Sequence, residues 1–275
     1  MSEPDRYNVV LIMTDQQRWD MMGCAGSDWV RTPHLDRLAA EGCRFANAFT
    51  TTPVCTPARA ALFTGMYAAS SGAAANQLSP FRHVAMLGDI LTDRGVTAGY
   101  TGKWHLGGPE GAYYGSGRPD GGFLGDYWYE GRNFIDDVGE EGFRRWREGH
   151  DLADEDCWGW RVADRTIRFL QEHHEEPFVF VASFDEPHGP SSAPERFYKP
   201  YEGTTRPWQP NMGDRLDGKP ATHRAMAEAQ QHNGHVPDGQ RPSNGPRYYG
   251  CMSFVDEQIG RIVDAVDGLC RDNTA

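Results

Sequence analysis

Residues 8–17 read NVVLIMTDQQ, an unbroken apolar run that ends at four polar residues. Because successive side chains of a strand point to opposite faces, a run without polar alternation indicates a strand that is buried on both faces. Strands of this kind occur in parallel sheets, whose connections usually contain a helix. The first element of the chain therefore predicts an α/β fold.

Working outward from this strand, helical and strand-like segments alternate along the chain. We predict strands at 96–100 and 178–182, and helices at about 32–42, 55–65, 84–94, 160–174 and 254–269. This alternation predicts a mostly parallel sheet with helices on both faces. Two stretches rich in glycine, proline and polar residues, about 107–156 and 190–246, interrupt the pattern, and we expect them to be long loop insertions.

Length and composition restrict the class of protein. A chain of 275 residues with 39% hydrophobic residues can bury a core as a single domain. Its 39 acidic and 27 basic residues give a net charge of −12, which argues against a nucleic-acid partner. No apolar run reaches the roughly 18 residues of a membrane span, and the polar start predicts no signal peptide. The six cysteines form no C-x-x-C pair and no disulfide framework, so we expect a cytoplasmic protein. Because no apolar run is long enough, we expect no membrane partner.

Polar side chains follow each of the three predicted strands. Asp15 and Gln16 end the first strand, Lys103 and His105 follow the second, and residues 185–188 follow the third. Ligands of open parallel sheets bind at the carboxyl ends of the strands. We therefore expect these side chains to lie together in a functional site.

Residues 55–65 read CTPARAALFTG and contain the most specific motif of the chain. Pro57 suits the first position of a helix, and Thr56 is a suitable cap before it. Cys55 then lies at a helix N-terminus, where free N–H groups favour an anion, and Arg59 offers a planar fork to sulfate or phosphate oxygens. The residues alone indicate a cysteine of lowered pKa beside an oxyanion site, with a buried structural thiol as the alternative.

This motif resembles the C-x-P-x-R signature of the formylglycine-dependent (type I) sulfatases, members of the alkaline-phosphatase-like superfamily. Other segments similar to that family follow in its order: NVVLIMTDQQ at 8–17, TPHLDRLAAEG at 32–42, GKWHLG at 102–107 and DEPHGP at 185–190. The resemblance implies an alkaline-phosphatase-like α/β fold and a hydrolase that cleaves a small-molecule or saccharide sulfate ester.

The resemblance also implies a covalent modification and a metal ion. A formylglycine-generating maturation enzyme would oxidise Cys55, and the hydrated aldehyde would attack the sulfur of the substrate. Asp15, Gln16 and the modified Cys55 correspond to metal ligands. The metal is usually Ca²⁺ in this family, with Mg²⁺ as a second option.

Four further residues correspond to catalytic positions of the family. Arg59 and Lys103 would hold the oxygens of the formylglycine and of the sulfate. His105 would assist turnover of the formylglycine, and His188 would lie near the leaving-group oxygen.

Two alternatives to a sulfatase stay open. Gln16 stands where many members have a second aspartate, and Asp-Gln pairs also occur in related phosphonate monoester hydrolases, so phosphonate or phosphate esters are alternative substrates. Family members continue beyond a helix like 254–269 into a strand with further metal ligands, whereas residues 272–273 are predicted to be a turn. We therefore expect a truncated N-terminal catalytic domain with weak activity, or a non-catalytic degenerate fragment.

Overall fold

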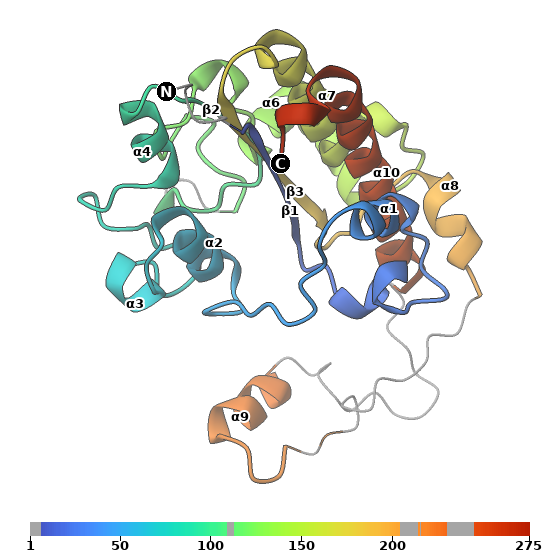
Figure 1. Ribbon diagram of the computed structural model, residues 1–275. Helices are drawn as coiled ribbons and strands as arrows, with labels where there is room; N and C mark the ends of the chain where they lie inside the picture. Colours follow the sequence, from blue (N-terminus) through green and yellow to red (C-terminus); the bar gives the residue numbers. More distant parts are fainter. Residues whose placement is uncertain (1–6, 109–112, 204–213, 215, 230–244) are drawn as a thin grey trace.

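A three-stranded parallel sheet forms the centre of the computed structural model, which describes residues 7–108, 113–203, 214, 216–229 and 245–275. The strands are β1 (Val9–Asp15), β2 (Thr97–Gly102) and β3 (Phe178–Pro187), in the order β1-β3-β2 (Figure 1). All three were predicted from their apolar runs, and the α/β fold with a parallel sheet is confirmed. Since β3 lies between the other two, its side chains form the middle of both buried faces.

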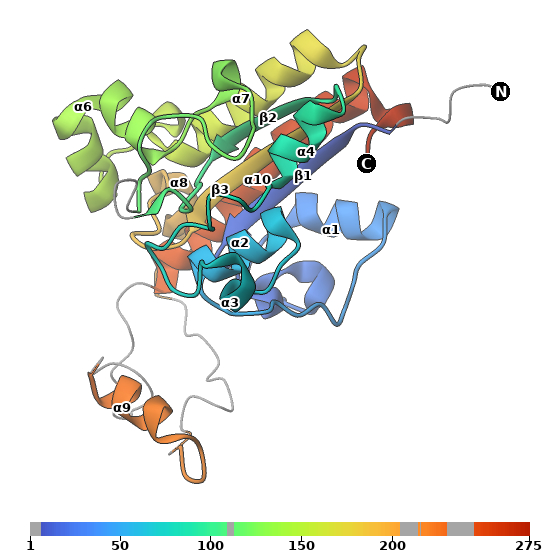
Figure 2. The same ribbon diagram turned by 90° about the vertical axis from the view of Figure 1, so that its left-hand side faces the viewer.

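Helices cover both faces of the sheet. On one face lie α7 (Trp158–His173) and α10 (Gly245–Leu269), and on the other lie α2 (Cys55–Thr64) and α4 (Leu87–Asp93) (Figure 2). The other helices are α1 (Pro33–Glu41), α3 (Ala68–Ser71), α6 (Gly131–Glu148), α8 (Glu195–Tyr198) and α9 (Ala221–Ala229). Among the described residues, no helix is both long enough and apolar enough to cross a membrane.

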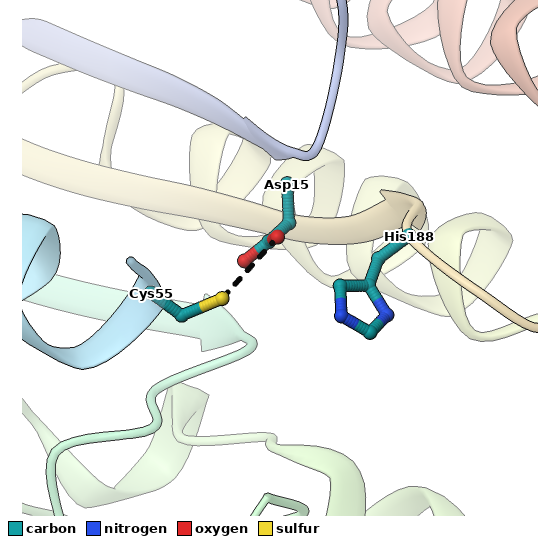
Figure 3. Close-up of side chains that lie close together, drawn as sticks. All are labelled: Asp15, Cys55 and His188. Atoms are coloured by element: carbon teal, nitrogen blue, oxygen red, sulfur yellow. Dashed lines mark hydrogen bonds between the residues drawn. The ribbon is translucent and has the colours of Figure 1, made fainter. Parts of the chain in front are cut away.

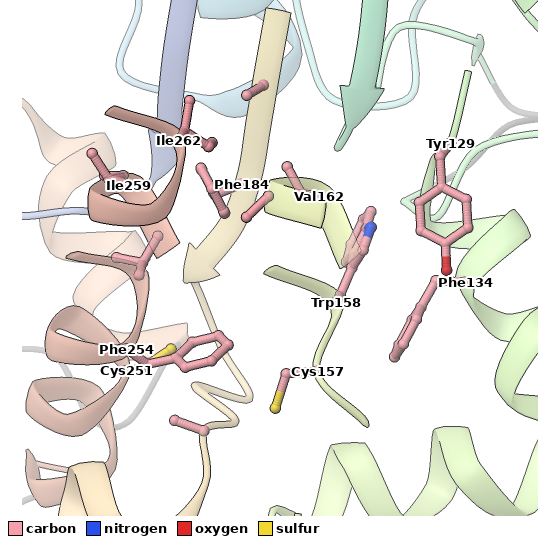
Figure 4. Packing of buried hydrophobic residues seen from close by; sticks show 14 of the residues in the cluster. Tyr129, Phe134, Cys157, Trp158, Val162, Phe184, Cys251, Phe254, Ile259 and Ile262 are labelled. Atoms are coloured by element: carbon pink, nitrogen blue, oxygen red, sulfur yellow. The ribbon is translucent and has the colours of Figure 1, made fainter. Parts of the chain in front are cut away.

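The alternation of side chains along β3 divides the core into two clusters. Phe180 and Phe184 belong to the cluster formed with α7 and α10, in which Figure 4 labels Phe184. Val181 belongs to the cluster formed with α2 and α4. All three side chains are fully buried. Burial of each contributes roughly 1.5–3 kcal/mol to stability. The unbroken apolar run in the sequence is thus explained by a strand that is covered on both sides.

The stretch 107–156, which we expected to be a loop insertion, contains the 18-residue helix α6, so that expectation was wrong. Phe134 and Trp146 anchor α6 to the core, with ring centroids 5.3 Å apart. The helical spacing was hidden because Gly139, with φ +68° and ψ 173°, interrupts the helix in its middle. In the second stretch, 190–246, the described residues include α8 and α9, and residues 204–213, 215 and 230–244 lie outside the description.

The predicted turn at 272–273 is confirmed as part of a 3₁₀ turn over Arg271–Asn273. Beyond it, the chain runs parallel to the start of β1. The amide of Asn8 donates to the carbonyl of Asn273 at 2.7 Å, and the amide of Val10 donates to the carbonyl of Ala275 at 2.9 Å. Residues 273–275 therefore pair with the edge of β1 that faces away from β3.

The N-terminus of α1 is capped by a side chain from α10. Asp256, which is 1% exposed, accepts hydrogen bonds from the amides of His34 at 3.1 Å and Leu35 at 2.8 Å. Thr32, the residue before the helix, makes no capping bond, because its hydroxyl accepts from Gly23 and donates to Asp36. The first helix is therefore held by a carboxylate more than 200 residues away, not by its own flanking sequence.

We predict that Asp256→Ala lowers the free energy of unfolding by about 1–2 kcal/mol, the usual cost of losing a helix cap. Urea unfolding followed by circular dichroism measures this difference. Asp264→Ala, on an exposed residue of the same helix that pairs with Arg37, is the matched control and should change stability by about 0.5 kcal/mol or less. Equal stability of the Asp256→Ala variant and the wild type would contradict the capping role.

Candidate active site

The carboxyl ends of the three strands meet at one edge of the sheet, as the sequence predicted. Asp15 is the last residue of β1, Lys103 follows β2, and Asp185 lies near the end of β3. Cys55 begins α2 and points toward Asp15, while His188 approaches from the chain that follows β3 (Figure 3). The segments that carry the predicted site residues are thus brought together by the parallel order of the strands.

A buried network of charges occupies this edge. The Lys103 ammonium lies 3.0 Å from Asp15 Oδ2 and 2.9 Å from Asp185 Oδ1, and its side chain is 0% exposed. Arg59 also contacts Asp15 Oδ2, at 3.2 Å, and donates to the hydroxyl of Ser183 at 2.8 Å. Burial by itself raises the pKa of Asp15, but Lys103 and Arg59 outweigh it and leave that pKa below its usual value. Asp15 is therefore a buried carboxylate that stays ionised.

Cys55 lies at the N-terminus of α2, but its thiol differs from the sequence prediction. Its Sγ is 3.6 Å from Asp15 Oδ1. Burial raises the pKa of the thiol, Lys103 opposes this, and the carboxylate of Asp15 adds to it, so the pKa lies above its usual value. The predicted lowered pKa was wrong, because burial of the thiol, together with the adjacent carboxylate of Asp15, outweighs the effect of Lys103 on its pKa. Cys55 is thus a neutral thiol at neutral pH.

The predicted cap of α2 was also wrong. Val54 is the cap residue and Cys55 is the first residue of the helix. The hydroxyl of Thr56 donates to the carbonyl of His105 at 2.8 Å, and its amide donates to Asn76 Oδ1 at 3.0 Å. Thr56 therefore joins the start of α2 to the segment that carries His105, and Asn76, to which the sequence analysis gave no role, binds the amide of Thr56.

His105 has an unusual backbone and an unusual imidazole. Its φ of +58° is in the left-handed region, and its buried Nδ1 has no hydrogen-bond partner among the described residues. Burial, followed by the positive charges of Lys103 and Arg59, lowers the pKa of His105 to about 4. The imidazole is therefore neutral near pH 7 and can accept a proton.

Tyr113 and Asp185 complete the network; the sequence analysis expected Asp185 among the polar residues at the strand ends and gave Tyr113 no part in the site. The Tyr113 hydroxyl donates to Asp185 Oδ1 at 2.5 Å and accepts from the Lys103 ammonium at 2.8 Å. It also lies 2.8 Å from Nδ1 of His188. No local motif marks Tyr113, and Asp185 was noted only as a polar residue at a strand end.

Gln16, predicted as a metal ligand, follows Asp15 but is exposed. Its φ is +57°, and its carbonyl accepts from the Tyr248 hydroxyl at 2.7 Å. Its side chain makes no hydrogen bond to the described residues. The structure thus places Gln16 beside Asp15, outside the buried charge network.

The fold and this buried set of charges define a protein of the alkaline-phosphatase-like class. A solved putative sulfatase, YidJ of Bacteroides fragilis, matches with a TM-score of 0.72 and 27% identity over all of this chain and 61% of that chain. The phosphonate monoester hydrolase of Agrobacterium radiobacter matches with a TM-score of 0.74 and 24% identity, covering 98% of this chain and 61% of that chain, and shows the shared fold.

The family model described as Sulfatase matches residues 7–275, and the chain therefore belongs to the sulfatase family. Among curated relatives, the uncharacterized sulfatase YidJ of Escherichia coli K12 is 36% identical over 98% of this chain. The ulvan-active sulfatase of Formosa agariphila is 30% identical over 97% of it. These alignments cover 55% and 48% of the two relatives, so the chain spans about half their length.

We predict that His105 makes stability depend on pH between about 6.5 and 4. In this range the unfolded chain binds a proton at His105 that the folded chain does not, so the free energy of unfolding falls as the pH falls. Urea unfolding at a series of pH values should show a shallower dependence for His105→Gln than for the wild type. His150→Gln, at an exposed histidine, should follow the wild type; equal slopes for wild type and His105→Gln would contradict the lowered pKa.

Proposed function

We propose that the protein hydrolyses sulfuric esters with a formylglycine made from Cys55 and a divalent metal ion. The observation that carries this proposal is the position of Cys55 at the start of α2, in contact with Asp15, whose carboxylate also contacts Arg59 and Lys103. A neutral thiol is a poor nucleophile, so the raised pKa of Cys55 argues against direct thiolate catalysis. Formylglycine, when present and hydrated, has two hydroxyl groups: one can attack the sulfur, and the other can drive the elimination of sulfate. No standard side chain offers this pair of groups.

The side chains around Cys55 are suited to hold an anion. Arg59 is fixed by Ser183 and by the carbonyl of Lys103, so its guanidinium is positioned before a substrate arrives. The ammonium of Lys103 adds a second positive charge at the same point. We assign to these two residues the binding of sulfate oxygens.

Two histidines differ in their assigned roles. His105 is neutral near pH 7, and its Nδ1 has no hydrogen-bond partner in the part of the chain that the structure describes, so we assign it the acceptance of a proton during turnover of the formylglycine. His188 is half-buried and contacts Tyr113, and we assign it a position near the leaving-group oxygen. Tyr113 and Asp185 act as positioning residues, since they hold Lys103 and His188 in place.

The residues present fit part of a calcium site. Oδ1 of Asp15 faces Cys55, while its Oδ2 binds Lys103 and Arg59. Ca²⁺ takes about six to eight oxygen ligands. We propose that Asp15, Gln16 and the oxidised Cys55 hold one side of a Ca²⁺ ion, with Mg²⁺ as the alternative.

The names of two relatives support a saccharide substrate. One acts on ulvan, and another, 25% identical over 84% of this chain, is the N-acetylglucosamine-6-O-sulfatase of Bacteroides thetaiotaomicron. We propose a saccharide sulfate ester as substrate and a formylglycine-generating enzyme as partner. All six cysteines are free thiols, which supports a reducing, cytoplasmic location.

Hydrolysis of phosphonate monoesters is the second candidate function. Gln16 after Asp15 permits this function, because the family resemblance implies Asp-Gln pairs both in bacterial sulfatases and in phosphonate monoester hydrolases. The likeness to a solved phosphonate monoester hydrolase shows the common fold and leaves the substrate open.

We predict that co-expression with a formylglycine-generating enzyme converts Cys55 and lowers the mass of its tryptic peptide by about 18 Da. The exposed Cys43, which lacks the C-x-P-x-R context, is the internal control and should keep its thiol. Peptide mass spectrometry measures both residues in one sample. An intact Cys55 thiol, with a maturation enzyme shown to be active on another substrate, would contradict the proposed modification.

We predict that Arg59→Lys lowers turnover of an aryl sulfate by about 10²–10³ in the matured full-length gene product. An ammonium cannot reproduce the planar fork that contacts Asp15 and Ser183. Arg37→Lys, on an exposed pair with Asp264, is the control and should leave the rate unchanged.

Assay of an aryl phosphonate monoester beside the sulfate ester decides between the two functions, since faster phosphonate cleavage would overturn the sulfatase assignment.

A further inference from the structure

The unmodified site contains three different metal-binding atoms at close range. A carboxylate oxygen of Asp15, the sulfur of Cys55 and a ring nitrogen of His188 all lie within 4.8 Å of one another. Figure 3 shows the three side chains converging from β1, α2 and the segment after β3. This is a carboxylate, a thiol and an imidazole, a donor set that differs from the all-oxygen shell preferred by calcium.

Asp15 and His188 each have a second polar atom that is held by other groups. Oδ2 of Asp15 binds Lys103 and Arg59, whereas Oδ1 lies beside the Cys55 thiol. Nδ1 of His188 lies 2.8 Å from the carbonyl of Gly189, which can only accept a hydrogen bond. Nδ1 therefore carries a proton, which leaves Nε2 as the ring nitrogen that can bind a metal ion. Histidines that bind metals usually donate their second N–H to a carbonyl or carboxylate in this way.

The charges of the site also allow a cation. Asp15 and Asp185 balance the positive charges of Lys103 and Arg59, and His105 is neutral near pH 7. Loss of the thiol proton from Cys55 leaves one uncompensated negative charge at the sulfur. A divalent cation bound there replaces the proton and is attracted by the net charge.

We propose that, while Cys55 is still a thiol, Asp15 Oδ1, Cys55 Sγ and His188 Nε2 bind Zn²⁺, with water as a fourth ligand. Zinc bonds of about 2.0–2.3 Å in a tetrahedron place the ligand atoms roughly 3.5 Å apart. The sulfur and Oδ1 are already 3.6 Å apart. On binding, the S–H bond breaks, the proton passes to solvent, and the sulfur replaces a water molecule on the ion.

This site would act before maturation and oppose it. The zinc–sulfur bond draws electron density from the sulfur and restricts access to it, so the sulfur reacts more slowly with an oxidising enzyme or an alkylating reagent. The chain with bound zinc would therefore keep its thiol, while formylglycine, which has no sulfur, would lose the site. The inference concerns the unmodified chain and holds whether or not the mature protein hydrolyses sulfate esters.

Titration of the unmodified protein with Co²⁺ tests the site directly. We expect a sulfur-to-cobalt charge-transfer band in the near ultraviolet that saturates at one equivalent and disappears when Zn²⁺ is added. Cys55→Ala should abolish the band, and His188→Ala should weaken cobalt binding at least tenfold. Cys43→Ala, which removes an exposed thiol, should leave it unchanged. Circular dichroism of each variant establishes that it is folded.

A second measurement follows the thiol without cobalt. We expect one equivalent of Zn²⁺ to slow alkylation of Cys55 by iodoacetamide at least tenfold, as measured by peptide mass spectrometry, whereas millimolar Ca²⁺ has no effect. Alkylation of Cys43 in the same sample should not change. Absence of the cobalt band in the wild type, its survival in Cys55→Ala, or equal alkylation rates with and without Zn²⁺ would each overturn the proposal.

Discussion

The ammonium of Lys103, buried between the carboxylates of Asp15 and Asp185, is the interaction on which the rest of the site depends. Removing a lysine from water costs several kcal/mol, which two close carboxylates and a hydroxyl can offset. These partners come from the ends of β1 and β3, so the ion cluster fixes how the strand ends meet. Loss of one partner would leave a buried charge without compensation, and the Asp15 carboxylate that faces Cys55 would lose its orientation.

The backbone of the sheet is shaped to deliver Lys103 to this position. Gly102 ends β2 with φ +104°, and a Cβ atom there would lie 1.8 Å from the carbonyl oxygen of Ser183 on β3. Only glycine allows this approach, after which the amide of Lys103 donates to that same carbonyl at 2.8 Å. Gly102 of the GKWHLG segment is therefore explained by the close packing of β2 against β3. Lys103 is explained by its ion pairs with Asp15 and Asp185.

The surroundings of Cys55 disfavour a reactive thiolate. A helix N-terminus and two cations would normally stabilise a thiolate, but burial and the adjacent Asp15 keep the sulfur protonated. A free thiolate at Cys55 is therefore disfavoured. Two other states are compatible with the site: a chemically modified residue 55, or a metal ion that replaces the thiol proton.

The sequence by itself determined the strands and the roles proposed for Cys55 and Arg59, because apolar runs and a short motif act over neighbouring residues. It missed α6, where Gly139 breaks the helical spacing, and it assigned Cys55 the wrong direction of pKa shift. The tertiary structure alone decided that Tyr113 contacts His188, 75 residues away, and that Asp256 caps α1. The physical reason is that hydrogen bonding and desolvation depend on distances in space, which local spacing along the chain does not encode.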